Sequence, residues 1–384
     1  MNSKPTIMFY VQHRLGIGHV FRAVRVAKGL ARAGCETHIV WGGAKIASMD
    51  TTDINMHYLQ AVHVNDEDFK ALLLDDGSRI DDAGIKARGD HLLELYTDIQ
   101  PDIVITEAYP FGRRQMRFEL IPFIEKANET RPRPLIVCSI RDIMQENRAP
   151  KRVRESLDAI HNWYDIVMVH GDPKLIPIEA TLQDAHEVED KIRYTGLVTP
   201  DAVDRSQKPS ISPDVIVSAG GGAVGKALMH AAVDAMQYCR NFPTNWCLTT
   251  GPDLPQVEFD LIAARAPKGM KVTRFIIDLA RVMANGKVSV SRAGYNTVGD
   301  LLRAQCVCVL VPFTGGLETE QLRRAQMMDK QSLATVLLDE NLDAKTLAAA
   351  IDKAALLDRR TASFDLDGAD KAAEILISEY EKTR

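Results

Sequence analysis

A glycine turn followed by a carboxylate marks the part of the chain with the clearest chemistry. The residues up to Ser291 predict a strand, Gly294 a tight turn, and the residues after it a helix. Such a turn lets backbone N–H groups face a ligand at a helix N-terminus, where the dipole favours phosphate or another anion. Asp300 falls within the predicted helix, and its carboxylate suits hydroxyl groups, which donate hydrogen bonds to it. An anion site beside a carboxylate that accepts hydrogen bonds from hydroxyl groups predicts a nucleotide ligand.

A second glycine turn follows the first predicted strand. Gly16 and Gly18 allow a tight turn and the close approach of a ligand to the backbone. A dinucleotide-binding fingerprint needs a third glycine, but Phe21 and Arg22 occupy that region. The sequence therefore disfavours a nicotinamide cofactor.

His19 stands directly after this turn, on the first turn of a predicted helix. An imidazole at the carboxyl end of a strand would face a cleft between domains and could take a proton from a hydroxyl group or from water. A helix cap or a supporting histidine explains the position equally well. His13 lies in the same loop, where a solvated residue is the favoured interpretation.

A third glycine turn opens the second half of the chain at Gly220, Gly221 and Gly222. With Lys226 it has the G-x-x-x-x-G-K spacing of a phosphate loop, but Ala227 stands where Ser or Thr must bind magnesium. The sequence therefore disfavours an NTPase. Glycine N–H groups at a helix N-terminus could still hold a diphosphate, with Lys226 assisting. A strand-to-helix turn without a ligand is the alternative.

Polar side chains also follow two other predicted strands. Glu107, Tyr109, Arg113 and Arg114 come after one strand, and Arg141 comes after another. Because strand ends meet at one edge of a parallel sheet, these groups could bind a polar or anionic acceptor. Solvated loops account for them equally well.

Metal and redox chemistry are not indicated. Asp365 and Asp367 have the D-x-D spacing of some metal sites, but they precede the last predicted helix, where capping is favoured. The six cysteines form no C-x-x-C pair and lie in apolar surroundings, which predicts buried thiols. We expect no metal and no cofactor.

Short apolar runs alternate with amphipathic stretches, the pattern of parallel strands covered by helices. The strands predicted in the first half are 6–11, 37–41, 102–106, 135–140 and 165–169. The helices predicted there are 20–32, 85–100 and 113–128. The strands predicted in the second half are 215–218, 246–249, 270–275 and 336–338.

The length of 384 residues favours two domains. Residues 199–213 are rich in Pro, Ser, Asp and Lys and lack an apolar period, which is typical of a linker. We expect an N-terminal domain over 1–200, a linker over 201–213 and a C-terminal domain over 214–366. The last segment, 367–384, is predicted to be a helix that could pack back on the N-terminal domain.

Composition limits the partners. Apolar residues make up 46% of the chain, the formal charge is −5, and no long run of Lys or Arg occurs, which argues against a nucleic-acid partner. The first residues lack the apolar region of a signal peptide, and no window has the ~18 apolar residues that span a bilayer. We expect a cytoplasmic protein, with peripheral contact at the inner face of the membrane left open.

The second half, over about 215–338, resembles the C-terminal domain of glycosyltransferase family 28, which includes the MurG-type N-acetylglucosaminyltransferases. Residues 275–280 and 291–300 carry this resemblance, since they fit the family pattern without a gap. It implies a GT-B fold, in which two Rossmann-like, doubly wound parallel-sheet domains face each other across a cleft. The C-terminal domain would then bind the nucleotide-sugar donor, and the N-terminal domain the acceptor.

The resemblance also implies roles for single residues. The backbone of Phe275 and Ile276 would bind uracil, Asp300 the ribose, and Glu320 and Gln321 the sugar. The family usually has two glutamines at the last two positions, so Glu320 departs from the pattern. The remaining donor-binding candidates are Gly220, Gly221, Gly222, Lys226, Asp278, Arg292, Gly294, Asn296 and Thr297. For Arg292 a structural salt bridge is an equal alternative.

The N-terminal glycine turn resembles the loop of the same family whose histidine is taken as the base. Residues 18–22 also resemble nucleotide-sugar hydrolases of the PseG type. The resulting hypothesis is an inverting, metal-independent transfer of a hexosyl or N-acetylhexosaminyl group from a UDP-sugar to an acceptor hydroxyl, with His19 as general base. The alternatives are nucleotide-sugar hydrolysis and non-catalytic nucleotide-sugar binding. The acceptor-binding candidates are His13, Gly16, Gly18, Glu107, Tyr109, Arg113, Arg114 and Arg141.

Overall fold

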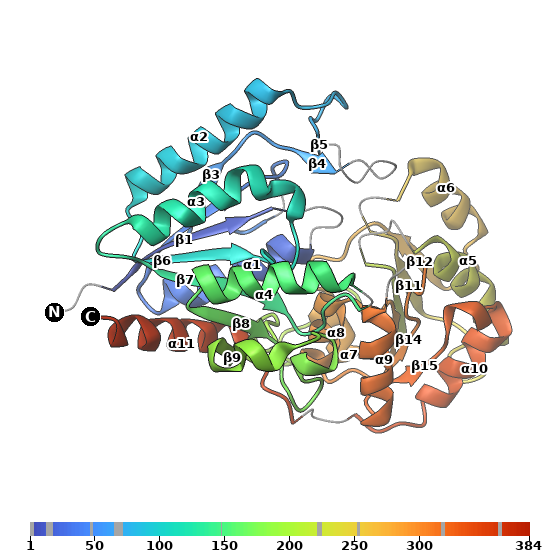
Figure 1. Cartoon of the computed structure of the whole chain (residues 1–384). Coiled ribbons are helices and arrows are strands. Elements are labelled where there is room, and N and C mark those ends of the chain that lie inside the picture. Colours follow the sequence, from blue (N-terminus) through green and yellow to red (C-terminus); the bar gives the residue numbers. More distant parts are fainter. Residues whose placement is uncertain are drawn as a thin grey trace. The chain divides into compact units, whose positions relative to one another are not determined.

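The computed structural model of the chain describes residues 4–12, 18–46, 49–64, 72–146, 148–220, 225–251, 254–315, 319–359 and 363–384. The chain forms two compact α/β units (Figure 1). Unit 1 contains Met1–Val198 together with Asp367–Arg384, and unit 2 contains Thr199–Leu366. The predicted alternation of strands and helices is therefore present in both units.

Within the described residues, the main sheet of unit 1 has seven parallel strands in the order β3-β2-β1-β6-β7-β8-β9. These strands are β1 (Thr6–Val11), β2 (Glu36–Trp41), β3 (Asn55–Tyr58), β6 (Ile103–Glu107), β7 (Leu135–Arg141), β8 (Ile166–His170) and β9 (Ile192–Tyr194). A separate antiparallel pair consists of β4 (His63–Val64) and β5 (Leu72–Leu73). The strand order runs outward from β1 on one side and from β6 on the other. The order in which successive strands are added therefore reverses between β1 and β6, although all strands are parallel. Sheets of this type commonly bind ligands at such a point.

Helices cover both faces of this sheet. The α-helices of unit 1 are α1 (Gly18–Arg32), α2 (Asp82–Ile99), α3 (Arg117–Glu129), α4 (Pro150–Trp163) and α11 (Gly368–Lys382). Its short 3-10 helices are η1 (Arg114–Met116), η2 (Ile178–Ala180) and η3 (Ala185–Lys191). Alternate residues of a strand point to opposite faces, so Phe9 packs with α1 and α11 while Tyr10 packs with α2, α3 and α4.

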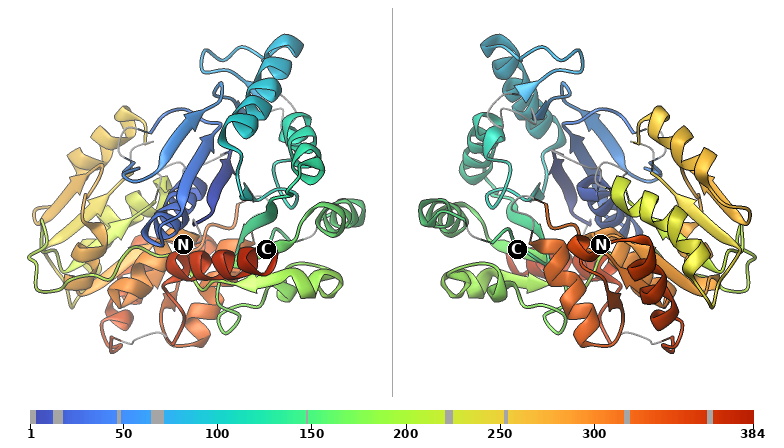
Figure 2. Two further views of the ribbon diagram at one scale, coloured as in Figure 1. Left: turned by 90° about the vertical axis from the view of Figure 1, so that its left-hand side faces the viewer. Right: turned by 90° about the vertical axis from the view of Figure 1, so that its right-hand side faces the viewer.

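The last helix returns to unit 1 and packs along α1 (Figure 2). Gly29 of α1 makes this close approach possible, because a Cβ at this position would lie 2.4 Å from the carbonyl oxygen of Ala369. A β-bridge joins Val198 to Asp367, so the chain leaves and re-enters unit 1 at neighbouring points. Unit 2 is therefore an insertion between two paired segments of unit 1.

Within the described residues, the sheet of unit 2 has six parallel strands in the order β12-β11-β10-β13-β14-β15. These strands are β10 (Val215–Ser218), β11 (Trp246–Thr249), β12 (Met270–Thr273), β13 (Val288–Ser291), β14 (Cys308–Leu310) and β15 (Thr335–Val336). Its helices are α5 (Lys226–Ala235), η4 (Met236–Tyr238), α6 (Gln256–Arg265), α7 (Leu279–Asn285), α8 (Tyr295–Ala304), α9 (Glu320–Lys330), η5 (Asp339–Asn341) and α10 (Ala344–Ala354). The strand order reverses between β10 and β13.

The segment predicted as a linker belongs to unit 2. The Nη2 of Arg205 donates to the carbonyl oxygen of Ala304 at 2.8 Å, and the backbone N–H of Ser210 donates to Asp278 at 2.8 Å. Hydrogen bonds attach this segment to the rest of unit 2. It needs no amphipathic face for this, so its sequence shows no apolar period. The expectation of a separate linker over 201–213 was therefore wrong.

Two further results concern composition. All six cysteines are buried and unpaired, as the sequence predicted. Among the described helices, none combines the length and apolar character that crossing a membrane requires.

Candidate functional site

The reversal of strand order brings loops that are far apart in the sequence to the same sheet edge. In unit 1, Tyr10 of β1 pairs in register with Thr106 of β6, so the carboxyl ends of β1 and β6 are neighbours. In unit 2, Ser218 of β10 pairs with Ser291 of β13. The glycine turns after these two strands therefore leave the same edge of the sheet of unit 2, side by side.

In unit 1 this edge joins His19 to Glu107. The Nδ1 of His19 lies 2.9 Å from Oε1 of Glu107, and Arg22, one helical turn beyond His19, pairs with the same oxygen. The Glu107 side chain is fully buried, whereas 18% of the His19 side chain is exposed. Nη2 of Arg22 also lies 3.1 Å from this Nδ1. We assign the proton of the neutral ring to Nδ1, where Glu107 accepts it, so the lone pair of His19 lies on Nε2. No hydrogen bond from a described residue engages that Nε2.

The buried carboxylate of Glu107 is ionised because three groups donate to it. Besides His19 and Arg22, Ser139 donates from Oγ to Oε2 at 2.7 Å. Burial raises the pKa of Glu107, but the charge of Arg22 and the hydrogen bonds from His19 and Ser139 outweigh burial and hold the pKa well below its usual range. Glu107 is therefore a fixed negative charge beside the imidazole.

The imidazole itself is neutral at physiological pH. Burial and the nearby guanidinium of Arg113 lower the pKa of His19 to about 3, and the hydrogen bond to Glu107 opposes this only in part. A neutral ring with its proton on Nδ1 can accept a proton at Nε2. The arrangement at His19 therefore has the chemistry of a general base held by a carboxylate.

The hydrogen-bonded chain continues beyond Glu107. Ser139 Oγ lies 3.0 Å from Nε2 of His170, and Nδ1 of His170 lies 3.0 Å from Oγ1 of Thr195. His170 is completely buried, and burial together with the charge of Arg22 lowers its pKa to about 3. These groups fix the orientation of Glu107. Ser139 and Thr195 were not predicted from the sequence, although Ser139 stands opposite Glu107 in the parallel register of β6 and β7.

The other acceptor-binding candidates of unit 1 are less closely grouped. Arg113 donates from Nε to the backbone carbonyl of Gln12, and Arg114 forms an ion pair with Glu155. Arg141 is the last residue of β7, and Gly18 is the first residue of α1. His13 and Gly16 lie outside the described residues.

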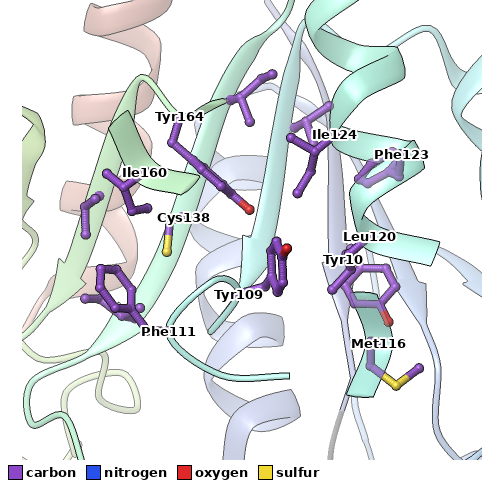
Figure 3. Close-up of a cluster of buried hydrophobic side chains, with 14 of the residues drawn as sticks. Tyr10, Tyr109, Phe111, Met116, Leu120, Phe123, Ile124, Cys138, Ile160 and Tyr164 are labelled. Carbon is purple, nitrogen blue, oxygen red and sulfur yellow. The ribbon is translucent and has the colours of Figure 1, made fainter. Parts of the chain in front are cut away.

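Tyr109 is not at an exposed edge. It is 1% exposed and belongs to the apolar core between the sheet and α2, α3 and α4, where Figure 3 shows it among Leu120, Phe123 and Tyr164. The chain after β6 turns this side chain into the core, which a strand-end position alone does not reveal. The prediction that Tyr109 binds the acceptor is therefore replaced by a packing role.

In unit 2, the structure describes the turn after β10 as far as Gly220 and again from Gly225. Gly220 has φ of +75°, which side chains rarely allow. Lys226 is the first residue of α5, and its Nζ forms an ion pair with Glu258. Gly221 and Gly222 lie outside the described residues.

The turn after β13 places Gly294 at the N-cap of α8, with Asn296 and Thr297 in the first helical turn and Asp300 half-buried in the second. The Oε1 of Gln321 accepts hydrogen bonds from the backbone N–H of Ala293 at 3.1 Å and of Phe313 at 3.2 Å. Gln321 therefore ties the start of α9 to the turns after β13 and β14.

Glu320 has a structural partner as well. Its Oε1 accepts from Nη2 of Arg324 at 2.7 Å, and Arg324, which is completely buried, donates from Nη1 to the carbonyl oxygen of Ala293 at 2.8 Å. Since Glu320 is 5% exposed, its carboxylate serves this buried ion pair. Glu320 thus braces the turn through Arg324, and its implied role in binding the donor sugar stays a prediction.

Four further donor-binding candidates belong to unit 2. Phe275 is 62% exposed after β12, and the neighbouring Ile276 is 6% exposed. Asp278 accepts hydrogen bonds from Ser210, and Arg292 forms an ion pair with Asp339 at 2.6 Å. The structural alternative considered for Arg292 is thus present.

Comparison with known proteins bears on both units. Residues 217–374 match the family model described as the glycosyltransferase family 28 C-terminal domain. A UDP-N-acetylglucosamine--N-acetylmuramyl-(pentapeptide) pyrophosphoryl-undecaprenol N-acetylglucosamine transferase of Geotalea uraniireducens is 22% identical over 214 residues, which cover 54% of this chain and 56% of that protein. The protein of the same name from Exiguobacterium sp. is 25% identical over 36% of this chain and 38% of its own length. The chain thus spans little more than half, or less, of these relatives.

One relative matches over more of its length. An uncharacterized glycosyltransferase of Methanosarcina mazei is 22% identical over 340 residues, covering 84% of this chain and 83% of that protein. Among solved structures, MurG of Acinetobacter baumannii aligns with a TM-score of 0.59 and 16% identity over 98% of this chain and 99% of its own. The calicheamicin glycosyltransferase CalG4 aligns with a TM-score of 0.60 and 14% identity over 100% and 95%. These likenesses confirm the GT-B fold.

Proposed function

We propose, from the match of residues 217–374 to the glycosyltransferase family 28 C-terminal domain, that this chain transfers a sugar from a UDP-sugar to a hydroxyl group of an acceptor. His19 is the general base, and the reaction inverts the configuration at the anomeric carbon without a metal ion. The observation that carries the proposal is the contact between Nδ1 of His19 and the buried carboxylate of Glu107.

In the proposed reaction, Nε2 of His19 takes the proton of the acceptor hydroxyl as its oxygen bonds to the anomeric carbon. The bond from that carbon to the diphosphate oxygen breaks, and its electron pair leaves with UDP. Glu107 stabilises the imidazolium that forms, and Arg22 and Ser139 keep Glu107 ionised and oriented. Both groups have the protonation state that the reaction needs, since His19 is neutral and Glu107 is ionised.

Negative charge develops on the leaving diphosphate. The N-termini of α5 and α8 begin at neighbouring strand ends, and their dipoles favour an anion there. Lys226 can exchange Glu258 for a phosphate at small cost, since exposed ion pairs contribute only about 0–1 kcal/mol. These groups would stabilise the diphosphate in the way that a divalent cation does in other enzymes.

Asp300, in the second turn of α8, is the proposed ribose ligand.

The donor assignment follows from the relatives, two of which carry UDP-N-acetylglucosamine in their names. An experiment with different nucleotide sugars decides between transfer of a hexosyl and of an N-acetylhexosaminyl group. UDP-, GDP- and dTDP-sugars should be compared in thermal unfolding, where a ligand at ~100 times its Kd adds about 2.7 kcal/mol. Release of UDP over many turnovers only with an acceptor supports transfer. Release without acceptor identifies a hydrolase, and no release identifies a binding protein.

The pH dependence tests the state of His19. Because the base must be neutral and its pKa is lowered to about 3, kcat/KM should stay level as the pH falls from 8 to about 5. An ordinary histidine would lose activity near its usual pKa of about 6.5. Replacing Arg113 by Gln removes a cation that lowers this pKa, so the acidic decline should move to higher pH.

The matched control for this measurement is Arg240→Gln, which removes an exposed charge from unit 2. It should leave the pH profile unchanged. A wild-type profile that declines around pH 6.5, or one that Arg113→Gln does not move, would contradict the proposed state of His19.

A further inference from the structure

Four arginines gather where the chain leaves β6 and β7. Arg114 and Arg117 follow β6, and Arg148 and Arg152 flank the start of α4, which follows β7. Ser156 of α4 donates a hydrogen bond to the backbone carbonyl of Pro110 at 3.0 Å, so the start of α4 is tied to the segment after β6. We refer to Arg114, Arg117, Arg148 and Arg152 as the arginine cluster.

The arginine cluster carries more positive charge than its neighbours balance. Arg114 and Arg117 share one oxygen of Glu155, at 2.6 and 3.0 Å. Within the described residues, no carboxylate forms an ion pair with Arg148 or Arg152. Arg114 and Arg117 therefore have one carboxylate between them, and the positive charges of Arg148 and Arg152 are not balanced by an ion pair with any described residue.

Two donors of the cluster are also unsatisfied. The Nη1 of Arg148 and the Nε of Arg117 are buried and have no hydrogen-bond partner in the described part of the chain. Buried donors without partners are destabilising, and most such donors in folded proteins are satisfied by a protein group, a water molecule or a ligand. Both atoms therefore favour a ligand that accepts hydrogen bonds.

Two more features favour an anion at this place. Burial and the neighbouring guanidiniums of Arg114 and Arg152 lower the pKa of Arg148, as expected where like charges are held together. The helix α4, of 14 residues, has Ala149 at its N-cap, so no side chain caps it. Its dipole adds partial positive charge beside Arg148 and Arg152.

We propose that the arginine cluster is a binding site for a phosphate monoester. Guanidinium groups bind phosphate through paired N–H···O bonds, and a monoester carries about −1.5 to −2 charges at pH 7. A carboxylate or a phosphodiester carries only one negative charge and would leave more of the excess unbalanced. Glu155 competes with the ligand for Arg114 and Arg117. The site does not depend on the transferase activity proposed for His19.

The test is calorimetric titration of the full chain with glycerol 3-phosphate. The double variant Arg148→Gln/Arg152→Gln should bind about 10- to 100-fold more weakly, because it removes charged hydrogen bonds. The matched control is Arg133→Gln/Arg154→Gln, which removes two charges that already pair with Asp165, Asp158 and Glu187. The control should bind as the wild type does, and higher salt should weaken binding in both.

A second variant tests whether a loss of glycerol 3-phosphate binding could come from misfolding. Glu155→Gln removes the competing carboxylate, so it should bind glycerol 3-phosphate several-fold more tightly than the wild type. Equal affinity of the wild type and Arg148→Gln/Arg152→Gln would overturn the proposal. Binding to phosphatidylglycerol vesicles, tested against phosphatidylcholine vesicles, without binding of glycerol 3-phosphate would also overturn it in favour of a diester headgroup.

Discussion

Replacing His19 by alanine is expected to lower kcat by about 10²- to 10⁴-fold, the usual contribution of a general base. The affinity for the UDP-sugar should stay within about twofold, because the candidate donor residues belong to unit 2. The side chain is partly exposed, so its loss creates no large cavity and the fold should persist. Steady-state release of UDP at saturating donor and acceptor measures the effect.

The matched control is His186→Ala, which removes an exposed histidine of unit 1. It should retain wild-type turnover. Glu107→Gln should show an intermediate loss of kcat, since the ring keeps a hydrogen-bond partner but loses the charge that stabilises its protonated form. Unchanged turnover of His19→Ala, with both hydroxyl acceptors and water, would show that His19 is not the base.

The variant Glu119→Leu is expected to lower the free energy of unfolding by about 3–5 kcal/mol, because it leaves Arg88 as an unpaired buried charge. Both side chains are fully buried, and Arg88 donates from Nε to Glu119 at 2.7 Å. Tyr10 also donates to Glu119, and Arg88 donates to Gln12 at 2.7 Å. This single substitution thus disrupts contacts that join β1, α2 and α3.

The double variant Arg88→Met/Glu119→Leu separates the cost of an unpaired charge from the loss of the contacts themselves. It should be more stable than Glu119→Leu alone, since no charge remains buried without a partner. Urea unfolding midpoints measure both variants. As a control, Asp90→Ala removes a partner of the exposed pair with Lys86 and should cost less than about 1 kcal/mol. A double variant less stable than Glu119→Leu would contradict this account.

Much of the fold could be predicted because short buried strands carry their own signal. The strands at 6–11, 215–218 and 246–249 match the structure residue for residue. They are apolar runs bounded by turn residues, as parallel strands with both faces covered usually are. The helix α4 was not among the predictions, because its buried residues, including Val153, Leu157 and Ile160, are spread among charged ones. The start of α3 was misplaced because Arg113 adopts left-handed backbone angles and a 3-10 turn precedes the helix.

The candidate site was predictable only in part. His19 and Glu107 were both identified from their positions at strand ends, but their contact joins residues separated by 88 positions. Glu320 was assigned to the sugar by resemblance, whereas its buried neighbour Arg324 makes it part of the framework. Tyr109 shows the same limit, since the path of one turn places it in the core. Residue type and position along a strand do not reveal which neighbour a side chain meets.

The sequence by itself determined the doubly wound class and the glycine turns, because these depend on local spacing and on the period of apolar residues. It also showed the resemblance of the second half to the glycosyltransferase family 28 C-terminal domain. Only the tertiary structure decided that Glu107, Ser139 and His170 form one hydrogen-bonded chain behind His19. It also decided that α11 closes unit 1 and that Arg114 and Arg117 share one carboxylate. The physical reason is that the order and register of parallel strands set which distant loops become neighbours, and burial among those neighbours sets the charge each group carries.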